Sequence, residues 1–139
     1  MRLNTYLTFN GQCEAAFKFY EQCLGGRIAG MFTYAGTPIA GQVPEEWLNK
    51  IMHATLKVGD DVLMGVDTPP DRYKGSHGFS VNIAVEQPAE ADRVFEALSE
   101  NGKVHMPIQQ TFWSERFGML VDQFGIPWMV NCEGGVKYE

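Results

Sequence analysis

Residues 112–132 read Phe-Trp-Ser-Glu-Arg-Phe-Gly-Met-Leu-Val-Asp-Gln-Phe-Gly-Ile-Pro-Trp-Met-Val-Asn-Cys, and this stretch predicts the final strand pair of the fold. Two apolar runs, 117–121 and 126–130, stand on either side of Asp122-Gln-Phe-Gly125. Gly125 can adopt a positive φ and Asp122 can accept a hydrogen bond within its own turn, so the stretch predicts a β-hairpin. Pro127 has no N–H for a sheet ladder, so we expect it at a strand start or on an edge.

Just before this hairpin, Trp113 and Arg116 place an aromatic plane and a fixed cation close together in the sequence. One interpretation is a core tryptophan and a solvated arginine, as residue statistics favour. The other is a pocket wall that stacks on, and pairs with, an anionic or carbonyl-bearing ligand. The sequence leaves both interpretations open.

Two amphipathic helices are predicted upstream, over about residues 13–24 and 89–100. Their apolar stripes correspond at a constant offset of 74 residues: Phe17 with Ala91, Tyr20 with Val94, and Leu24 with Leu98. Strands are predicted before and after each helix, because apolar and polar residues alternate there, and the strand before the second helix is expected over residues 79–85. Gly25-Gly26 is predicted to end the first helix as a left-handed cap, and Pro88 is predicted at or next to the first turn of the second helix. Each half of the chain therefore predicts one strand, one helix and about three further strands.

The predicted fold class is α+β, with two βαβββ modules that form curved, mostly antiparallel sheets around a cleft. The first module covers about residues 1–67 and the second about residues 78–133. Residues 68–77, which contain Pro69-Pro70 and Gly75, are the predicted linker. We expect one domain over residues 1–139, with a loose tail from residue 133. Tyr6, Thr8, Ser80 and Asn82 would line the cleft.

Charge and composition exclude several classes of partner. The 17 acidic and 11 basic residues give a net charge of −6, and the basic residues do not cluster. Nucleic acid and membrane surfaces are therefore not expected as partners. No apolar run is long enough to span a membrane, and the first residues do not resemble a secretory signal. Cys13, Cys23 and Cys132 form no CxxC pair, which favours reduced thiols and a cytoplasmic location.

Several motifs, in the same order, resemble those of the vicinal-oxygen-chelate superfamily, which includes glyoxalase I, bleomycin-resistance and extradiol-dioxygenase proteins. They are Tyr6-Leu-Thr-Phe-Asn-Gly11, Leu24-Gly-Gly26, His53-Ala54, Leu63-Met-Gly-Val-Asp67, Trp113-x-x-Arg116 and Asp122-x-Phe-Gly-x-x-Trp128. Within the superfamily the chain is similar to the PhnB-like branch, often labelled a demethylubiquinone methyltransferase-like domain. The resemblance implies a homodimer, but it does not imply one reaction, because the fold hosts unrelated activities.

The resemblance also implies a divalent metal held by four side chains. The corresponding positions here are Asn4 or Thr5, Met64, Ser80 and Met129. None of them offers the imidazole or carboxylate that such an ion needs. His53, His77 and His105 lie in separate segments without metal-site spacing. We therefore predict no metal and no cofactor.

The leading functional hypothesis is a small-molecule-binding protein without an assigned reaction. The predicted ligand-binding residues are Tyr6, His53, Asn82, Trp113 and Arg116, with Arg116 as the anchor for a carboxylate, phosphonate or carbonyl oxygen. The simpler interpretation makes His53 an exposed strand residue and gives Tyr6 and Asn82 only packing roles.

Two alternatives remain. The first is a glyoxalase-like lyase or isomerase that acts on a small oxygen-bearing metabolite. It would use either an atypical metal site involving His53, or metal-free acid–base chemistry by His53 and Tyr6. The second is a structural or regulatory partner with a vestigial cleft. A methyltransferase is not expected, because the chain lacks a Gly-rich turn that opens a helix after a strand.

Overall fold

The structure is a computed structural model that describes residues 1–133, so most of the predicted loose tail lies outside the described residues. The chain divides into two compact units, Met1–Gly75 and Ser76–Glu139. The boundary falls within the predicted linker 68–77. Whether the two units act as one domain around a cleft stays a prediction, and each unit is described by itself below.

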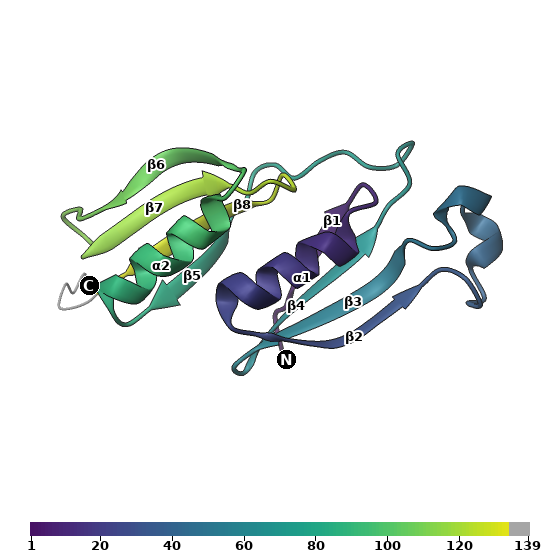
Figure 1. The fold of residues 1–139 in the computed structure, drawn as a ribbon, viewed down its shortest axis with the longest axis horizontal. Coiled ribbons are helices and arrows are strands. Elements are labelled where there is room, and N and C mark those ends of the chain that lie inside the picture. The colour runs from purple at the N-terminus through teal and green to yellow at the C-terminus, as the bar shows by residue number, and fades with distance from the viewer. Residues whose placement is uncertain (134–139) are drawn as a thin grey trace. The chain divides into compact units, whose positions relative to one another are not determined.

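Each unit contains one strand, one helix and three further strands (Figure 1). The first unit consists of β1 (Thr5–Phe9), α1 (Cys13–Leu24), β2 (Arg27–Thr33), β3 (Ile51–Val58) and β4 (Asp61–Asp67). Two short 3-10 turns, Ala40–Gln42 and Glu45–Trp47, lie between β2 and β3. The second unit consists of β5 (Val81–Val85), α2 (Pro88–Ser99), β6 (Lys103–Gln109), β7 (Arg116–Val121) and β8 (Pro127–Cys132).

The two sheets have the same topology. Their strand orders are β1-β4-β3-β2 and β5-β8-β7-β6. In each sheet the first strand pairs in parallel with the last, and the other two pairings are antiparallel. The predicted α+β fold with two βαβββ modules is therefore confirmed, with each module built on a mixed four-stranded sheet.

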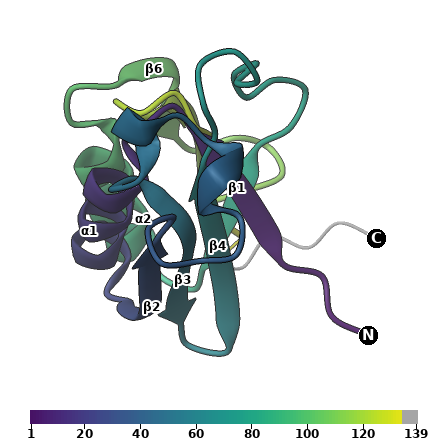
Figure 2. The ribbon, with the colours of Figure 1, turned by 90° about the vertical axis from the view of Figure 1, so that its right-hand side faces the viewer.

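The helix α1 covers one face of the first sheet (Figure 2). Cys13, Ala16, Phe17 and Tyr20 are fully buried there. A Cβ atom on Gly65 of β4 would lie 2.6 Å from Phe17 Cε1, so this strand position has to be glycine for the helix to sit so close. Gly25 ends α1 with a left-handed φ of 70°, as its predicted capping role requires.

The second unit repeats this packing. Ala91, Val94, Phe95 and Leu98 of α2 are buried against its sheet. Gly118 of β7 lies beneath the helix, and a Cβ atom there would lie 2.5 Å from Phe95 Cε2. Pro88 occupies the first turn of α2, as predicted. The predicted strand 79–85 is shorter than expected, because it begins only at Val81.

The predicted hairpin of residues 112–132 is present as β7 and β8. Gly125 has a φ of 87°, and Pro127 is the first residue of β8. The Asp122 carboxylate accepts hydrogen bonds from the backbone N–H groups of Phe124 (2.8 Å) and Ile126 (3.0 Å), and from Trp128 Nε1 (2.8 Å). One buried carboxylate thus fixes both the turn and the tryptophan that follows it.

Within residues 1–133, no helix combines the length and the apolar character needed to cross a membrane.

Candidate functional site

A chain of three polar side chains lies on the first sheet, on the face away from α1, which we call the distal face. Tyr6 Oη is 3.1 Å from His53 Nδ1, and His53 Nε2 is 3.1 Å from Thr55 Oγ1. The strand register explains the contact: Tyr6 of β1 pairs with Met64 of β4, and Met64 pairs with Thr55 of β3. Side chains at paired positions share a face of the sheet. Tyr6 and His53 are therefore in contact although they are 47 residues apart in the sequence.

Aromatic rings lie on both sides of the His53 imidazole. Phe32 of β2 pairs with His53, and their ring centroids are 5.7 Å apart with planes tilted by 31°. The Tyr6 ring is also 5.7 Å from the imidazole. Tyr6 and Phe32 are each 49% exposed, so both rings present apolar surface beside the polar chain.

The Tyr6 phenol remains protonated at neutral pH. Burial, and to a smaller extent the nearby Cys13 thiol, raise the pKa of Tyr6 above its ordinary value. A neutral phenol can donate one hydrogen bond and accept another, as can the Thr55 hydroxyl. A neutral imidazole donates from one nitrogen and accepts at the other. The hydrogen bonds of the Tyr6–His53–Thr55 chain can therefore run in either direction.

Beneath this chain, on the α1 side of the sheet, Asp67 holds three segments together. Its carboxylate accepts hydrogen bonds from the N–H groups of Cys13 and Ile51, both at 2.9 Å. Its backbone carbonyl accepts the Tyr34 hydroxyl at 2.7 Å and Trp47 Nε1 at 3.4 Å. Burial raises the pKa of Asp67, and hydrogen bonds from the backbone of Ile51, Cys13 and Gly11, together with the Lys50 charge, oppose that shift. Asp67 thereby fixes the start of β3, the strand that carries His53.

In the second unit, the predicted neighbours Trp113 and Arg116 point to different sides of the sheet. Arg116 Nε lies 3.2 Å from Asp92 Oδ1 on α2, and the guanidinium also donates to the Glu115 carbonyl at 2.8 Å. Arg116 therefore lies on the helix side. The Trp113 ring instead contacts Phe117, with centroids 5.6 Å apart, on the other side. The anchor role of Arg116 stays a prediction, but its guanidinium already has an acidic partner.

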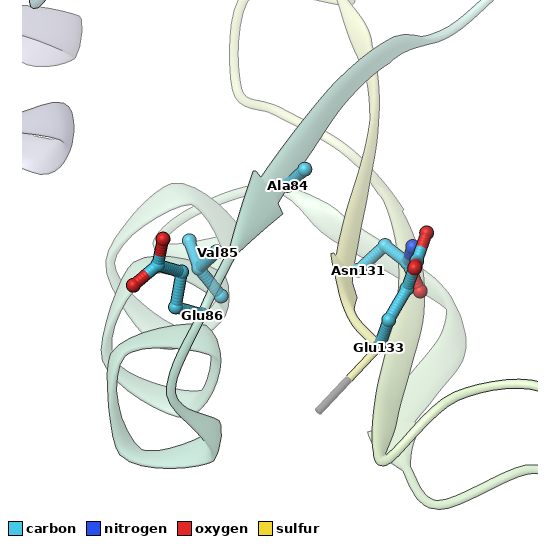
Figure 3. Close-up of a pocket in the computed structure, with 5 residues that line it drawn as sticks. All are labelled: Ala84, Val85, Glu86, Asn131 and Glu133. Atoms are coloured by element: carbon cyan, nitrogen blue, oxygen red, sulfur yellow. The ribbon is translucent and has the colours of Figure 1, made fainter. Parts of the chain in front are cut away.

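Asn82 lies on β5, where it pairs with Met129 of β8. Close to the end of the same strands, a hollow of about 430 Å³ is bordered by Ala84, Val85, Glu86, Asn131 and Glu133 (Figure 3). The Oδ1 atom of Asn131 lies 2.5 Å from the hydroxyl of buried Ser114. The hollow is large enough for a small molecule, but Asn82 does not border it.

Of the five predicted ligand-binding residues, Tyr6 and His53 are thus brought into direct contact. Asn82, Trp113 and Arg116 belong to the second unit, where no hydrogen bond, ion pair or ring contact joins them to one another within residues 76–133. The sequence analysis missed Phe32 and Thr55. Thr55 had a signal, because it lies two residues after His53 and therefore on the same strand face. Phe32 had none, because its pairing with His53 depends on a register interrupted by two irregularities.

The positions that would hold a metal do not fit one. Asn4, Met64, Ser80 and Met129 offer amide, thioether and hydroxyl groups, which are poor ligands for a divalent ion without carboxylate or imidazole support. In the part of the chain that the structure describes, no three His, Cys, Asp or Glu side chains come together in a group that could hold a metal ion.

Comparisons with known proteins agree with one another. The model of the glyoxalase/bleomycin resistance protein/dioxygenase superfamily matches residues 2–130. Protein YjdN from Escherichia coli K12 is 33% identical over 140 aligned positions, which cover 94% of this chain and 95% of that protein.

Two solved structures share the fold over almost their whole length. Protein PA1353 from Pseudomonas aeruginosa is 45% identical, with a TM-score of 0.88, over 96% of this chain and 98% of that one. A PhnB protein from Bacillus cereus is described as a putative 3-demethylubiquinone-9 3-methyltransferase. It is 25% identical, with a TM-score of 0.80, over 95% of this chain and 99% of that one.

Proposed function

This chain belongs to the glyoxalase/bleomycin resistance protein/dioxygenase superfamily, and we propose that it binds a small organic molecule on the distal face of its first sheet. The relatives YjdN and PhnB place it near the PhnB-like proteins. The proposed binding residues are Tyr6, His53, Thr55 and Phe32.

The observation that carries the proposal is the partly exposed Tyr6–His53–Thr55 chain beside Phe32. Small-molecule sites combine apolar surface with a few polar groups that fix the orientation of the ligand. Here half-exposed aromatic rings supply the surface, and three polar groups with reversible hydrogen bonds supply the orientation. If these side chains served only to stabilise the sheet, leaving Tyr6 and Phe32 half-exposed would forgo the stabilisation that burial of their rings provides.

A methyltransferase role is not proposed, although the Bacillus cereus relative is described as a putative one. A donor such as S-adenosylmethionine usually binds at a Gly-rich turn between a strand and a helix of a parallel sheet. In this chain Gly25 follows α1 instead of preceding it, and each sheet contains one parallel pair of strands.

A second candidate function, metal-free acid–base catalysis, is favoured by the direct contact between Tyr6 and His53. Tyr6 would take a proton from a bound substrate while passing its own proton to His53 Nδ1, and the reverse transfer would return a proton to another substrate atom. This function requires product formation, whereas the binding function requires only a saturable complex.

Binding can be tested by NMR with 15N-labelled protein and a library of small aromatic and carbonyl compounds. We expect saturable shifts at residues around His53, and at least tenfold weaker affinity in His53→Gln and Tyr6→Phe for the best compound. His105→Gln, which changes an exposed histidine on β6, is the matched control and should bind normally. Unchanged affinity in both site variants, or shifts confined to other regions, would contradict the proposal.

A further inference from the structure

The charges on the distal face have one sign. Side chains at alternate strand positions share a face, so the residues aligned with Tyr6 and His53 can be read from the register. Two charged residues occupy such positions on the four strands: Arg27 of β2 and Lys57 of β3. The acidic strand residues Asp61 and Asp67 share the face of Leu63, which is the α1 side.

Arg27 and Lys57 are direct cross-strand partners and both are exposed. Like charges placed opposite each other on neighbouring strands repel and destabilise the pair. Within residues 1–133, neither side chain forms an ion pair with a carboxylate. The two described ion pairs use other cations, Lys18 with Glu14 and Arg116 with Asp92. An acidic protein with a net charge of −6 thus presents an unneutralised cation pair on this face.

The position of this pair suits one end of a ligand. Lys57 follows His53 by four residues, which corresponds to about 13 Å along a strand. Lysine and arginine side chains can bridge about half of that distance. A ligand whose ring lies beside Phe32 and His53 would therefore reach both cations with a substituent that extends two or three bonds from the ring.

We propose that the ligand of the distal face is an organic anion, with its apolar body beside Phe32 and His53 and its acidic group between Arg27 and Lys57. This inference rests on the proposed function and names the ligand class for the same site. It also moves anion recognition away from Arg116, which is paired with Asp92 in the other unit.

Solvation offers a competing explanation. The turn after β3 carries Asp60 and Asp61, whose charges reduce the local positive potential even without an ion pair. On this explanation the two exposed cations form a solvated end of the sheet and recognise no ligand. The two explanations differ in one measurable respect: a recognition site discriminates an acid from its neutral isostere, and a solvated surface does not.

The test compares 3-phenylpropionate with 3-phenylpropionamide, which have the same shape and differ in charge. Binding is measured by NMR titration of 15N-labelled protein at pH 7.5, in low and in high salt. We expect the acid to bind at least tenfold more tightly than the amide at low salt, with the preference reduced at high salt. The double variant Arg27→Gln/Lys57→Gln should lose this preference but still bind the amide.

Two further variants change cations elsewhere: Lys18→Gln on α1 is the matched control, and Arg116→Gln on β7 tests the anchor role that the sequence predicted for Arg116. Both should keep the preference for the acid. The anion inference is overturned if acid and amide bind equally at the distal face, an outcome that leaves the proposed binding function intact. It is also overturned if the double variant keeps the preference, or if Arg116→Gln loses it. If neither compound shifts the signals around His53, both the inference and the proposed site for aromatic ligands fail.

Discussion

At the scale of the residue, the buried groups behind the site decide where His53 lies. Asp67 accepts the N–H groups that begin α1 and β3, and its carbonyl accepts Tyr34 and Trp47. The sequence analysis placed Asp67 only at the end of the first module, because nothing in its spacing reveals four donors from distant segments. Hydrogen-bond partners of this kind depend on tertiary packing, which a periodic pattern does not contain.

Cys13 provides a residue-scale prediction about alkaline pH. Burial first, and then the nearby Asp67 and Glu14 carboxylates, raise the pKa of this thiol far above its ordinary value. Above about pH 8.5 an unfolded thiol loses its proton while the folded one keeps it. The unfolded state then binds fewer protons, so the stability of the folded state falls as pH rises. We expect the wild type to lose about 2 kcal/mol more than Cys13→Ala between pH 8 and pH 10.

Urea unfolding at several pH values measures this difference. Val94→Ala is the control, because it removes buried apolar volume on α2 without removing a titrating group. It should lower stability at every pH and keep the pH dependence of the wild type. Parallel stability curves for wild type and Cys13→Ala between pH 8 and pH 10 would show that the folded thiol ionises as easily as the unfolded one.

At the scale of the element, hydrophobic periodicity predicted most of the helices and strands and their order along the chain. The stripes of α1 and α2, the glycine that ends α1 and the turn of the last hairpin all appear where the sequence analysis put them. These features depend on neighbours a few residues apart. Strand ends were less accurate: the strand expected from Phe79 begins at Val81, and Phe79 is 44% exposed. A residue that fits the alternating pattern of a strand becomes part of the sheet only if its backbone also pairs with a neighbouring strand.

The orientation of Arg116 is also decided at the scale of the element, by the strand that carries it. The sequence paired it with Trp113, three residues earlier, because the two are close along the chain. The alternation of β7 puts Arg116 on the same face as Gly118 and Leu120, against α2, where Asp92 is available. Proximity in sequence left a shared pocket wall as one of two interpretations, and strand geometry puts Trp113 and Arg116 on different sides of the sheet.

Close contact between helix and sheet leads to a prediction at Gly118. Its Cα atom faces Phe95, and a Cβ atom would also lie 3.0 Å from the backbone of Ile108. Because a backbone atom cannot move as easily as a side-chain end, we expect Gly118→Ala to destabilise the protein by about 1–3 kcal/mol. Thermal or urea unfolding measures the loss. Gly30→Ala on β2 is the control, since its added Cβ would meet nothing within 4 Å.

Combining Gly118→Ala with Phe95→Leu tests the cause of that loss. A smaller side chain at residue 95 leaves room for the new methyl group, so the two changes should be less harmful together than the sum of their separate effects. Strict additivity would instead assign the loss to the Ile108 backbone rather than to Phe95. A Gly118→Ala protein as stable as the wild type would mean that α2 shifts without cost.

At the scale of the whole molecule, the remaining prediction concerns assembly. Phe112 is 90% exposed and contacts Trp113 edge to face, with ring centroids 4.7 Å apart. Exposed aromatic pairs of this kind are frequent at protein–protein contacts. We expect the homodimer implied by the family resemblance, and we expect Phe112 to contribute to it. Sedimentation at micromolar concentration should give twice the 15.6 kDa of one chain.

The dimer prediction can be separated from misfolding by two substitutions. Phe112→Ser removes exposed apolar area without opening a core cavity, so it should weaken dimerisation at least tenfold while unfolding at nearly the wild-type temperature. Phe79→Ser, at a less exposed aromatic residue, is the matched control and should remain dimeric. A wild type that sediments as a monomer at every concentration would contradict the homodimer. A dimer of unchanged strength in Phe112→Ser would keep the homodimer but contradict the expected contribution of Phe112 to its interface.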